Sequence, residues 1–296
     1  MILCDALSGV GRHEEAIAQG TQAVALLQRL SQAAPAAHQL RLALSLRSLG
    51  RPLAALDRLD RAVEAGEQGV NAWRCLAQAD EGYEFDLTVT LEKLGRLLTA
   101  TGRYKETVRT YEEIVALRRR LSHPKADQLL ALSLINLTLP LAELNRHEDV
   151  LARGEEAVAI LRRLAQEDPA AHQPTLVMGL VQGLGLPLAR SDHWQLAEGH
   201  LREAVDLQRR LAQEDPAAHR PALANLLMVT VRVWISRRHA LQDALAAAEE
   251  AVEIYGTLAA RSPAAFRAPL DESLQLRDRL RATLPFNDER LEQGGH

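Results

Sequence analysis

The sequence predicts an all-α solenoid, in which helical hairpins stack one on the next. The stretch Glu155–Leu164, followed by Asp168-Pro169-Ala170-Ala171-His172, returns in close copies 47 residues later and 47 residues after that. A fixed period between 20 and 50 residues is the signature of a stacked array. Hydrophobic residues make up 47% of the chain and aromatic residues only 3%, and Ala and Leu dominate. These residues favour helices, while the β-branched residues of sheet proteins are sparse.

Turn residues divide the repeats into hairpins. A valine recurs at one position of the repeat, as Val24, Val63, Val115, Val158, Val205 and Val252. The residue 13 positions before each valine is a candidate turn residue, and these residues are Gly11, Gly50, Gly102, Asn145, Asp192 and His239. Gly, Asn and Asp accept the left-handed conformation that ends a helix, whereas His239 fits this rule least well. We expect a helix on each side of every turn, so that each repeat is a helical hairpin.

The expected helices follow in order from these turns, from prolines that end or begin helices, and from apolar residues at helical spacing. The first hairpin is incomplete, with its first helix reduced to residues 1–8. The remaining ranges are about 13–31, 37–49, 52–77, 85–101, 104–121, 126–144, 147–165, 174–190, 194–212, 221–238, 241–260 and 267–283. Residues 1–284 form the array and residues 285–296 a polar tail.

The second hairpin is expected to be irregular. Val24 and Val63 lie 39 residues apart, whereas Val63 and Val115 lie 52 residues apart. This spacing predicts a short first helix and a long second helix, which begins near Pro52 because proline suits a first turn. Pro140 and Pro187 lie five residues before their turns and are expected to kink both helices.

Composition excludes several classes of function. The net charge of −4, from 35 basic and 39 acidic residues, gives no basic face for nucleic acid. The only cysteines, Cys4 and Cys75, form neither a disulfide framework nor a metal-binding pair. No apolar run reaches the roughly 18 residues that span a bilayer. We therefore expect a cytoplasmic protein without membrane segment, metal or cofactor.

No catalytic set is visible, so the chain is not expected to be an enzyme. Gly179, Gly183 and Gly185 lack the following Gly-Lys-Ser/Thr of a phosphate loop and fit close helix contact instead. His172 and His219 recur at one phase of the repeat, which indicates a connector role rather than metal binding.

These hairpins resemble tetratricopeptide repeats (TPR), of the extended bacterial type. The resemblance covers nearly the whole chain and is carried by large–small pairs, turn glycines and two small residues in the second helix. The pairs are Leu94-Gly95, Leu184-Gly185 and Leu42-Ala43; the small residues are Ala16, Ala55, Ala197 and Ala244, then Ala23, Ala62, Ala157, Ala204 and Ala251. Thr107, Val150 and Ile114 depart from the pattern. The resemblance implies a right-handed α-solenoid of about six hairpins.

The resemblance also implies a concave groove, lined by the first helices, that binds a peptide or partner helix. Its polar residues would be Arg47, Glu92, Arg96, Glu143, Gln182, Arg190, Ser236 and Arg237, beside the apolar Leu44, Ile135, Leu139, Leu186, Val229 and Val233. The implied function is a non-catalytic protein–protein interaction scaffold or sensor module, such as the regulatory arm of a bacterial signalling system. The alternative is a structural homo-oligomer that assembles through exposed repeat ends.

Overall fold

The computed structural model describes residues 2–120, 125–191 and 193–284, and every regular element in these ranges is a helix. Six hairpins follow one another, and the first has a short first helix. The first four are α1 (Ile2–Gly9) with α2 (His13–Ala33), α3 (Pro35–Ala55) with α4 (Leu59–Ala79), α5 (Glu84–Ala100) with α6 (Tyr104–Arg118), and α7 (Ala126–Glu143) with α8 (His147–Glu167). In the fifth hairpin the first helix consists of three consecutive segments, α9 (Pro169–Met178), η2 (Gly179–Gly185) and α10 (Leu186–Ala189), and the second helix is α11 (Trp194–Glu214). The sixth is α12 (Pro216–Arg237) with α13 (Leu241–Arg261). A 3₁₀ turn, η1 (Glu81–Tyr83), precedes α5, and α14 (Pro263–Thr283) follows the last hairpin. The predicted all-α solenoid is confirmed, while the predicted tail 285–296 lies outside the described residues.

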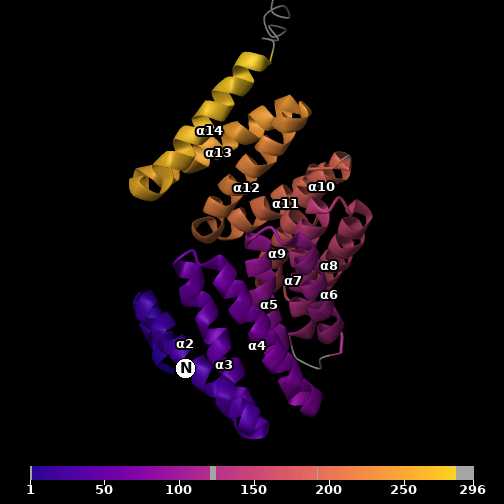
Figure 1. The fold of residues 1–296 in the computed structure, drawn as a ribbon. Coiled ribbons are helices and arrows are strands. Elements are labelled where there is room, and N and C mark those ends of the chain that lie inside the picture. The colour runs from indigo at the N-terminus through magenta and orange to yellow at the C-terminus, as the bar shows by residue number, and fades with distance from the viewer. Residues whose placement is uncertain (1, 121–124, 192, 285–296) are drawn as a thin grey trace, which may run out of the picture.

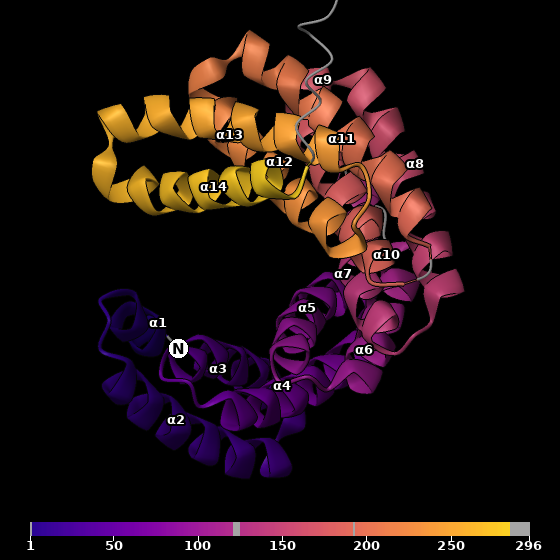
Figure 2. The ribbon, with the colours of Figure 1, turned by 90° about the horizontal axis from the view of Figure 1, so that it is seen from above.

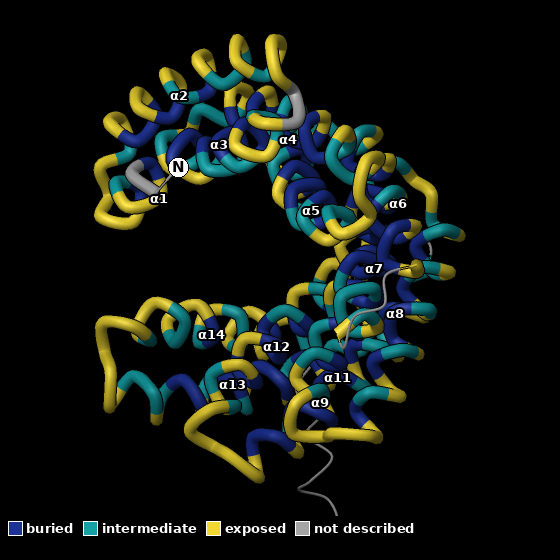
Figure 3. Tube along the Cα trace, turned by 90° about the horizontal axis from the view of Figure 1, so that it is seen from below, coloured by how far each residue is buried: buried dark blue, intermediate teal, exposed yellow. Residues whose placement is uncertain are grey.

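The hairpins stack into a curved row (Figure 1). Seen from above, the row forms an open C (Figure 2), and because the last helix lies far above the first in Figure 1, the row rises as it curves. The first helices of the hairpins, α1, α3, α5, α7 and α12, line the inner side together with α14, and the second helices form the outer side. Buried residues lie in the seam between these two layers (Figure 3). The core is therefore a continuous ribbon rather than a single centre.

The second hairpin corrects the predicted register. Helix α3 runs through Gly50 and Pro52 to Ala55, and the left-handed residue of the turn is Asp57, with φ 56°. The predictions of a turn at Gly50 and of a helix beginning near Pro52 are therefore wrong. With α4 beginning at Leu59, the second helices begin at residues 13, 59, 104, 147, 194 and 241, in regular steps of 43–47 residues.

This register moves the repeat positions of α4 by seven residues. Val70 takes the place expected for Val63, and Ala62 and Gly69 take the small positions expected for Ala55 and Ala62. Ala62 has no exposed surface, as is also true of Ala16, Thr107, Val150, Ala197 and Ala244 at the same position of the other second helices. Full burial of this position in every hairpin is the packing reason for a small or β-branched residue there.

The other turns agree with prediction except the last. Gly11, Gly102 and Asn145 have φ of 80°, 70° and 58°. In the last turn the left-handed residues are Arg238, with φ 49°, and Ala240, with φ 47°, and not His239. The N–H of His239 instead donates to the carbonyl of Trp234, which closes the turn. The predicted turn residue Asp192 lies outside the described residues.

The Asp-Pro-Ala-Ala-His stretches begin helices rather than close them. The side chains of Asp168 and Asp215 accept hydrogen bonds of 3.1 Å from the backbone N–H of Ala171 and Ala218. Proline follows each aspartate at the first helical position, where its missing N–H costs nothing. The first helices therefore begin at residues 169, 216 and 263, earlier than the predicted 174, 221 and 267.

Glycines in the second helices receive leucines from the next first helix. A Cβ atom at Gly20 would lie 2.5 Å from Leu49 Cδ2, and one at Gly66 would lie 3.1 Å from Leu94 Cδ1. Gly154 meets Leu184 in the same way. Gly179 and Gly185 also lie against leucines of neighbouring helices, which agrees with the predicted close helix contact.

The outer side carries a ladder of polar pairs between consecutive second helices. Each rung joins the residue 15 positions after the start of one helix to the residue nine positions after the start of the next. The described rungs are Arg74–Glu113 at 2.6 Å, Arg119–Glu156 at 2.6 Å, Arg162–Glu203 at 2.7 Å, Arg209–Glu250 at 2.6 Å and, as an amide pair, Gln28–Gln68 at 3.1 Å. We name this set the outer ladder.

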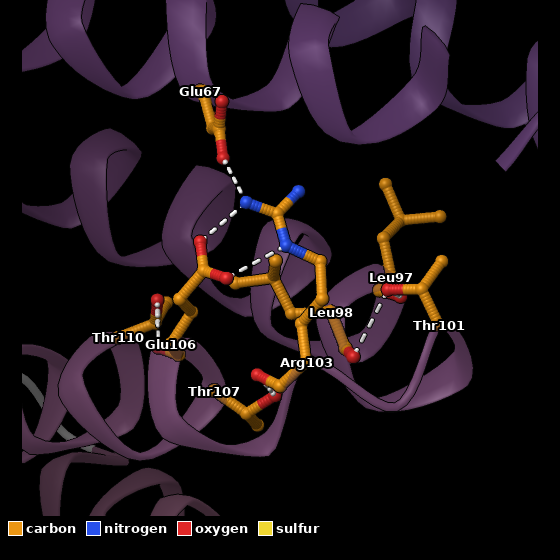
Figure 4. A network of polar contacts seen from close by, with 8 residues as sticks. All are labelled: Glu67, Leu97, Leu98, Thr101, Arg103, Glu106, Thr107 and Thr110. Carbon is orange, nitrogen blue, oxygen red and sulfur yellow. Dashed lines mark hydrogen bonds and ion pairs between the residues drawn. The ribbon is translucent and has the colours of Figure 1, made fainter. Parts of the chain in front are cut away.

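Arginines just before three of the second helices, α4, α6 and α8, contact the preceding repeat. Arg103, just before α6, donates to Glu67 of α4 at 3.1 Å and to Glu106 of its own helix at 2.8 Å (Figure 4). Arg146, just before α8, lies 3.9 Å from Glu112 at the equivalent position of α6. Arg58, just before α4, pairs instead with Glu14 near the start of α2. These exposed pairs are individually weak, but they recur from repeat to repeat and fix the spacing of neighbouring hairpins.

Candidate functional site

A groove of about 810 Å³ opens on the inner side of the array. Its walls come from the first helices of four consecutive hairpins, α5, α7, η2 with α10, and α12, and from one residue of the outer helix α6. Its polar lining comprises Arg96, Thr99, Tyr111, Asn136, Gln182, Arg190, Arg232 and Ser236, and its principal apolar lining Ile135, Leu139, Leu186, Pro187, Val229 and Val233. This set of residues is called the groove below.

The repeat geometry orders four of these residues along the groove. Arg96, Leu139, Leu186 and Arg232 each lie six residues before the turn position of their own hairpin. Leu139 is 40% exposed and Leu186 is 37% exposed, although both are large and apolar. Because stacked hairpins present equivalent positions in register, the groove has an apolar centre with an arginine on either side.

Half of the predicted groove residues line the cavity. These are Arg96, Gln182, Arg190 and Ser236. All the predicted apolar companions except Leu44 line it as well. The lining of the cavity thus overlaps the predicted residues on η2 and α12, just after α10 and in part on α5, and the predicted apolar companions on α7, α10 and α12.

The other four predicted residues lie outside the groove and have partners within the protein. Arg47 pairs with Asp86 at 2.7 Å, with its guanidinium 5.2 Å from the ring centre of Trp73. Glu92 pairs with Arg118 at 3.0 Å, and Glu143 with the groove residue Arg190 at 2.5 Å. Arg237 donates from Nε to the carbonyl oxygen of Ala189 and from Nη2 to that of Ser191, each at 3.1 Å. Their geometry thus indicates roles in holding helices together.

Sequence reasoning missed Tyr111 and Arg232 as groove residues. Tyr111 was overlooked because it belongs to a second helix, and these helices form the outer side. The available signal was its phase, since Gly20, Gly66 and Gly154 occupy the same position of α2, α4 and α8. Arg232 was overlooked because the turn was placed at His239 instead of Arg238.

The ring of Tyr111 packs directly on the backbone of Gly95, where no side chain intervenes, and in this way reaches the groove. A Cβ atom at Gly95 would lie 2.7 Å from Cε2 of Tyr111, so only glycine allows this approach. Tyr111 is 1% exposed and lines the groove, and the described polar atoms that are fully buried without a hydrogen-bond partner include Nε1 of Trp73 and of Trp234 but not the Tyr111 hydroxyl. Burial raises the pKa of Tyr111 to about 12, and the charge of Glu92 acts in the same direction. The phenol therefore remains a hydrogen-bond donor at neutral pH.

The inner surface beside Arg96 is cationic. Lys93 of the same helix has a lowered pKa, mainly because of burial and then because of the positive charges of Arg47 and Arg96, while Asp5 opposes the shift. The described residues that line the groove include three arginines and no carboxylate. Two of these arginines have carboxylate partners, Arg190 with Glu143 at 2.5 Å and Arg232 with Glu272 at 2.7 Å.

The described ranges hold no group of three or more His, Cys, Asp or Glu residues placed to bind a metal ion. Equally, none of their helices combines the length and the apolar character that crossing a lipid bilayer requires.

Solved structures share this architecture. BtubC (BKLC) from P. vanneervenii is 18% identical, with a TM-score of 0.51 over 77% of this chain and 94% of that chain. TPR-like repeats from Podosopora anserina are 19% identical, with a TM-score of 0.43 over 83% of this chain and 95% of that chain. No protein-family model matches the sequence, and no curated protein matches it significantly.

The fold assignment therefore rests on the hairpin array, on its small residues at fixed phases and on this structural likeness. Each repeat has 43–47 residues, more than the usual 34-residue unit. The second helices, mostly 21 residues long, account for this extra length. In its fold, the chain is an array of stacked helical hairpins similar to that of BtubC (BKLC) from P. vanneervenii.

Proposed function

We propose that the chain is a non-catalytic protein-interaction scaffold, which binds a segment of a partner protein in the groove. The observation that carries this proposal is the pair of exposed leucines, Leu139 and Leu186, at the centre of a concave surface. An apolar patch in a hollow with polar residues around it is typical of a binding site. The TPR fold supports the proposal because it stacks such hollows from rigid helices.

The chemistry of the groove favours binding over catalysis. The described residues that line it include no Asp, Glu, His, Lys or Cys to act as acid, base or nucleophile. A sensor or regulatory arm of a cytoplasmic bacterial signalling system is the specific form that we propose. It is supported by the resemblance of the Ala-, Leu- and Arg-rich repeats to such arms.

The test is a peptide-library selection on three forms of the chain. Replacing Leu139 and Leu186 together by glutamate introduces two charges into the apolar centre, so we expect the selected peptides to lose binding. Leu196 of α11 is 45% exposed and lies outside the groove, so Leu196→Glu is the matched control and should bind normally. Because all three leucines are partly exposed, the helical content by circular dichroism should remain that of the wild type. Peptides that bind all three forms equally would contradict the proposal.

The second candidate function, self-assembly, is favoured by one end of the array. Leu26 and Leu30 of α2 are 59% and 38% exposed, whereas Leu117 and Leu207, at the position of Leu26, are buried. At the other end, the described part of α14 exposes no large apolar side chain, and its exposed positions include Asp271, Gln275 and Arg279. Assembly through α14 is therefore disfavoured.

Light scattering distinguishes this second candidate. If the N-terminal ends pair, the chain will have twice its 32.6 kDa mass at micromolar concentration, and Leu26→Glu with Leu30→Glu will restore the monomer. A monomeric wild type at that concentration would rule out assembly through this end.

A further inference from the structure

We propose that His239 makes the contact between the fifth and sixth hairpins sensitive to pH, because protonation of its imidazole strengthens that contact. His239 is not among the described residues that line the groove, so this role is separate from the proposed function. Three features of the structure carry the proposal: the contacts of His239, the arginines at the corresponding turns, and the charges around Glu198.

His239 lies in the turn between α12 and α13 and reaches back to α11 of the preceding hairpin. Its Nε2 atom lies 3.2 Å from Oε2 of Glu198, and its ring centre lies 4.6 Å from that of Trp194. A hydrogen bond between an imidazole and a carboxylate becomes stronger when the imidazole carries a charge. A histidine side chain changes its charge between about pH 5 and 8. The strength of this contact between hairpins therefore depends on pH.

Three other turns hold an arginine that makes the comparable contact. They are the turns of Arg58, Arg103 and Arg146, which contact Glu14, Glu67 and Glu112 of the preceding second helix. An arginine keeps its charge at every pH in this range, so its side of the contact does not change. Directly before α13 stands Ala240 instead, and His239 makes the contact to the preceding second helix. The sixth hairpin thus has a titratable group where the others have a permanent cation.

The charges around Glu198 are unequal while His239 is neutral. Glu198 accepts a hydrogen bond from Arg202 at 2.8 Å, and Arg202 also pairs with Asp243 of α13 at 2.5 Å. These pairs bring together two carboxylates and one guanidinium, and only 15% of the Glu198 side chain is exposed. A proton on His239 supplies the second cation, so that the two opposite charges are equal in number.

The other cations of this turn do not supply the missing charge. Arg237 donates to backbone carbonyl oxygens of the preceding hairpin, so its guanidinium is bound elsewhere. Arg238 is exposed. Among the residues that the structure describes, the ion-pair partners of Glu198 are Arg202 and His239. His239 is therefore the group whose charge decides whether the carboxylates are balanced.

The test compares the wild type with two variants of the full chain. His239→Gln keeps a polar side chain that is never charged, whereas His239→Arg carries a charge at every pH, as the other turns do. Hydrogen–deuterium exchange of the backbone amides of α13 is measured for each chain at pH 5.5 and at pH 8. Because the chains are compared at the same pH, the intrinsic pH dependence of exchange cancels. All other histidines are retained, so their titration is common to the three chains.

At pH 5.5 we expect the wild type to exchange as slowly as His239→Arg and about threefold more slowly than His239→Gln, as a partly exposed ion pair implies. At pH 8 we expect it to exchange as fast as His239→Gln and about threefold faster than His239→Arg. The fluorescence of Trp194 gives a second readout, since an imidazolium quenches an indole that it contacts. It should fall in acid in the wild type and not in His239→Gln.

Three results would overturn the proposal. The wild type could follow His239→Gln at both pH values, which would mean that the proton adds nothing to the contact. It could follow His239→Arg at both, which would mean that the contact needs no proton. All three chains could exchange alike at each pH. As a control, Glu198→Gln should remove the difference between the wild-type residue and glutamine at position 239 at pH 5.5, and a difference that persists would assign the effect to another group.

Discussion

Replacing Arg118 by alanine is expected to lower the free energy of unfolding by about 3–5 kcal/mol. The Arg118 side chain is 3% exposed and pairs with Glu92 of α5 at 3.0 Å. It also donates to the carbonyl oxygen of Leu129 at 2.6 Å and to the hydroxyl of Ser133, both on α7. One buried cation thus joins three helices, and its removal leaves the Glu92 carboxylate without its counter-charge and opens a cavity.

Urea denaturation followed by circular dichroism measures this loss. Arg74→Ala is the matched control, because Arg74 belongs to the outer ladder, is 43% exposed, and should contribute less than about 1 kcal/mol. A second variant, Arg118→Met with Glu92→Leu, removes both charges and should recover much of the stability. Equal losses for Arg118→Ala and Arg74→Ala would show that the buried cation is not the link between α5, α6 and α7.

Gly154→Val is expected to destabilise the array by about 1–3 kcal/mol, the range for overpacking of a filled contact. A Cβ atom at Gly154 would lie 2.7 Å from the backbone oxygen of Gly183 and the same distance from Cγ of Leu184. The leucine can rotate, but the backbone oxygen cannot move without shifting η2. The substitution therefore separates α8 from the next hairpin.

The control for Gly154→Val is Gly199→Ala on α11. A Cβ atom there meets nothing within 4 Å, so the helix propensity of alanine should raise stability by about 1 kcal/mol. The two variants are compared by urea midpoint and by proteolysis rates of the loops. If both substitutions stabilise the chain, the contact between α8 and η2 is looser than this geometry implies.

The error in the second hairpin shows which part of a repeat fold sequence reasoning can reach. Val63 and Val70 lie seven residues apart, as do Ala55, Ala62 and Gly69. A shift of seven residues is close to two helical turns, so it leaves the same face of the helix apolar. Hydrophobic periodicity therefore predicted the helices and their buried faces but could not choose between the two registers. Only the turn could choose, and Gly50 was as acceptable there as Asp57.

A proline pattern contained the missing information. Pro140 and Pro187 lie five residues before their turn positions, and Pro52 lies five residues before Asp57. Extending that phase to Pro52 would have placed the turn at Asp57 from the sequence alone. The 21-residue length of α3, with proline inside it, also confirms that a proline late in a first helix is part of this repeat.

The cavity overlaps the predicted groove residues only in part. The phase of the first helices led to Arg96, Gln182, Arg190 and Ser236, which line the cavity, because equivalent positions of stacked hairpins face the same side. The internal partners of Arg47, Glu92 and Arg237 could not be read from phase, because they come from neighbouring helices whose approach depends on packing.

Because of the outer ladder, a hairpin can pair its charges with hairpins other than its present neighbour. Its rungs join the same two positions in every repeat, so deletion of one whole unit, residues 194–240, would set Arg162 opposite Glu250 and restore the pair. The array can thus gain or lose units in evolution without a new arrangement of charges on its convex side.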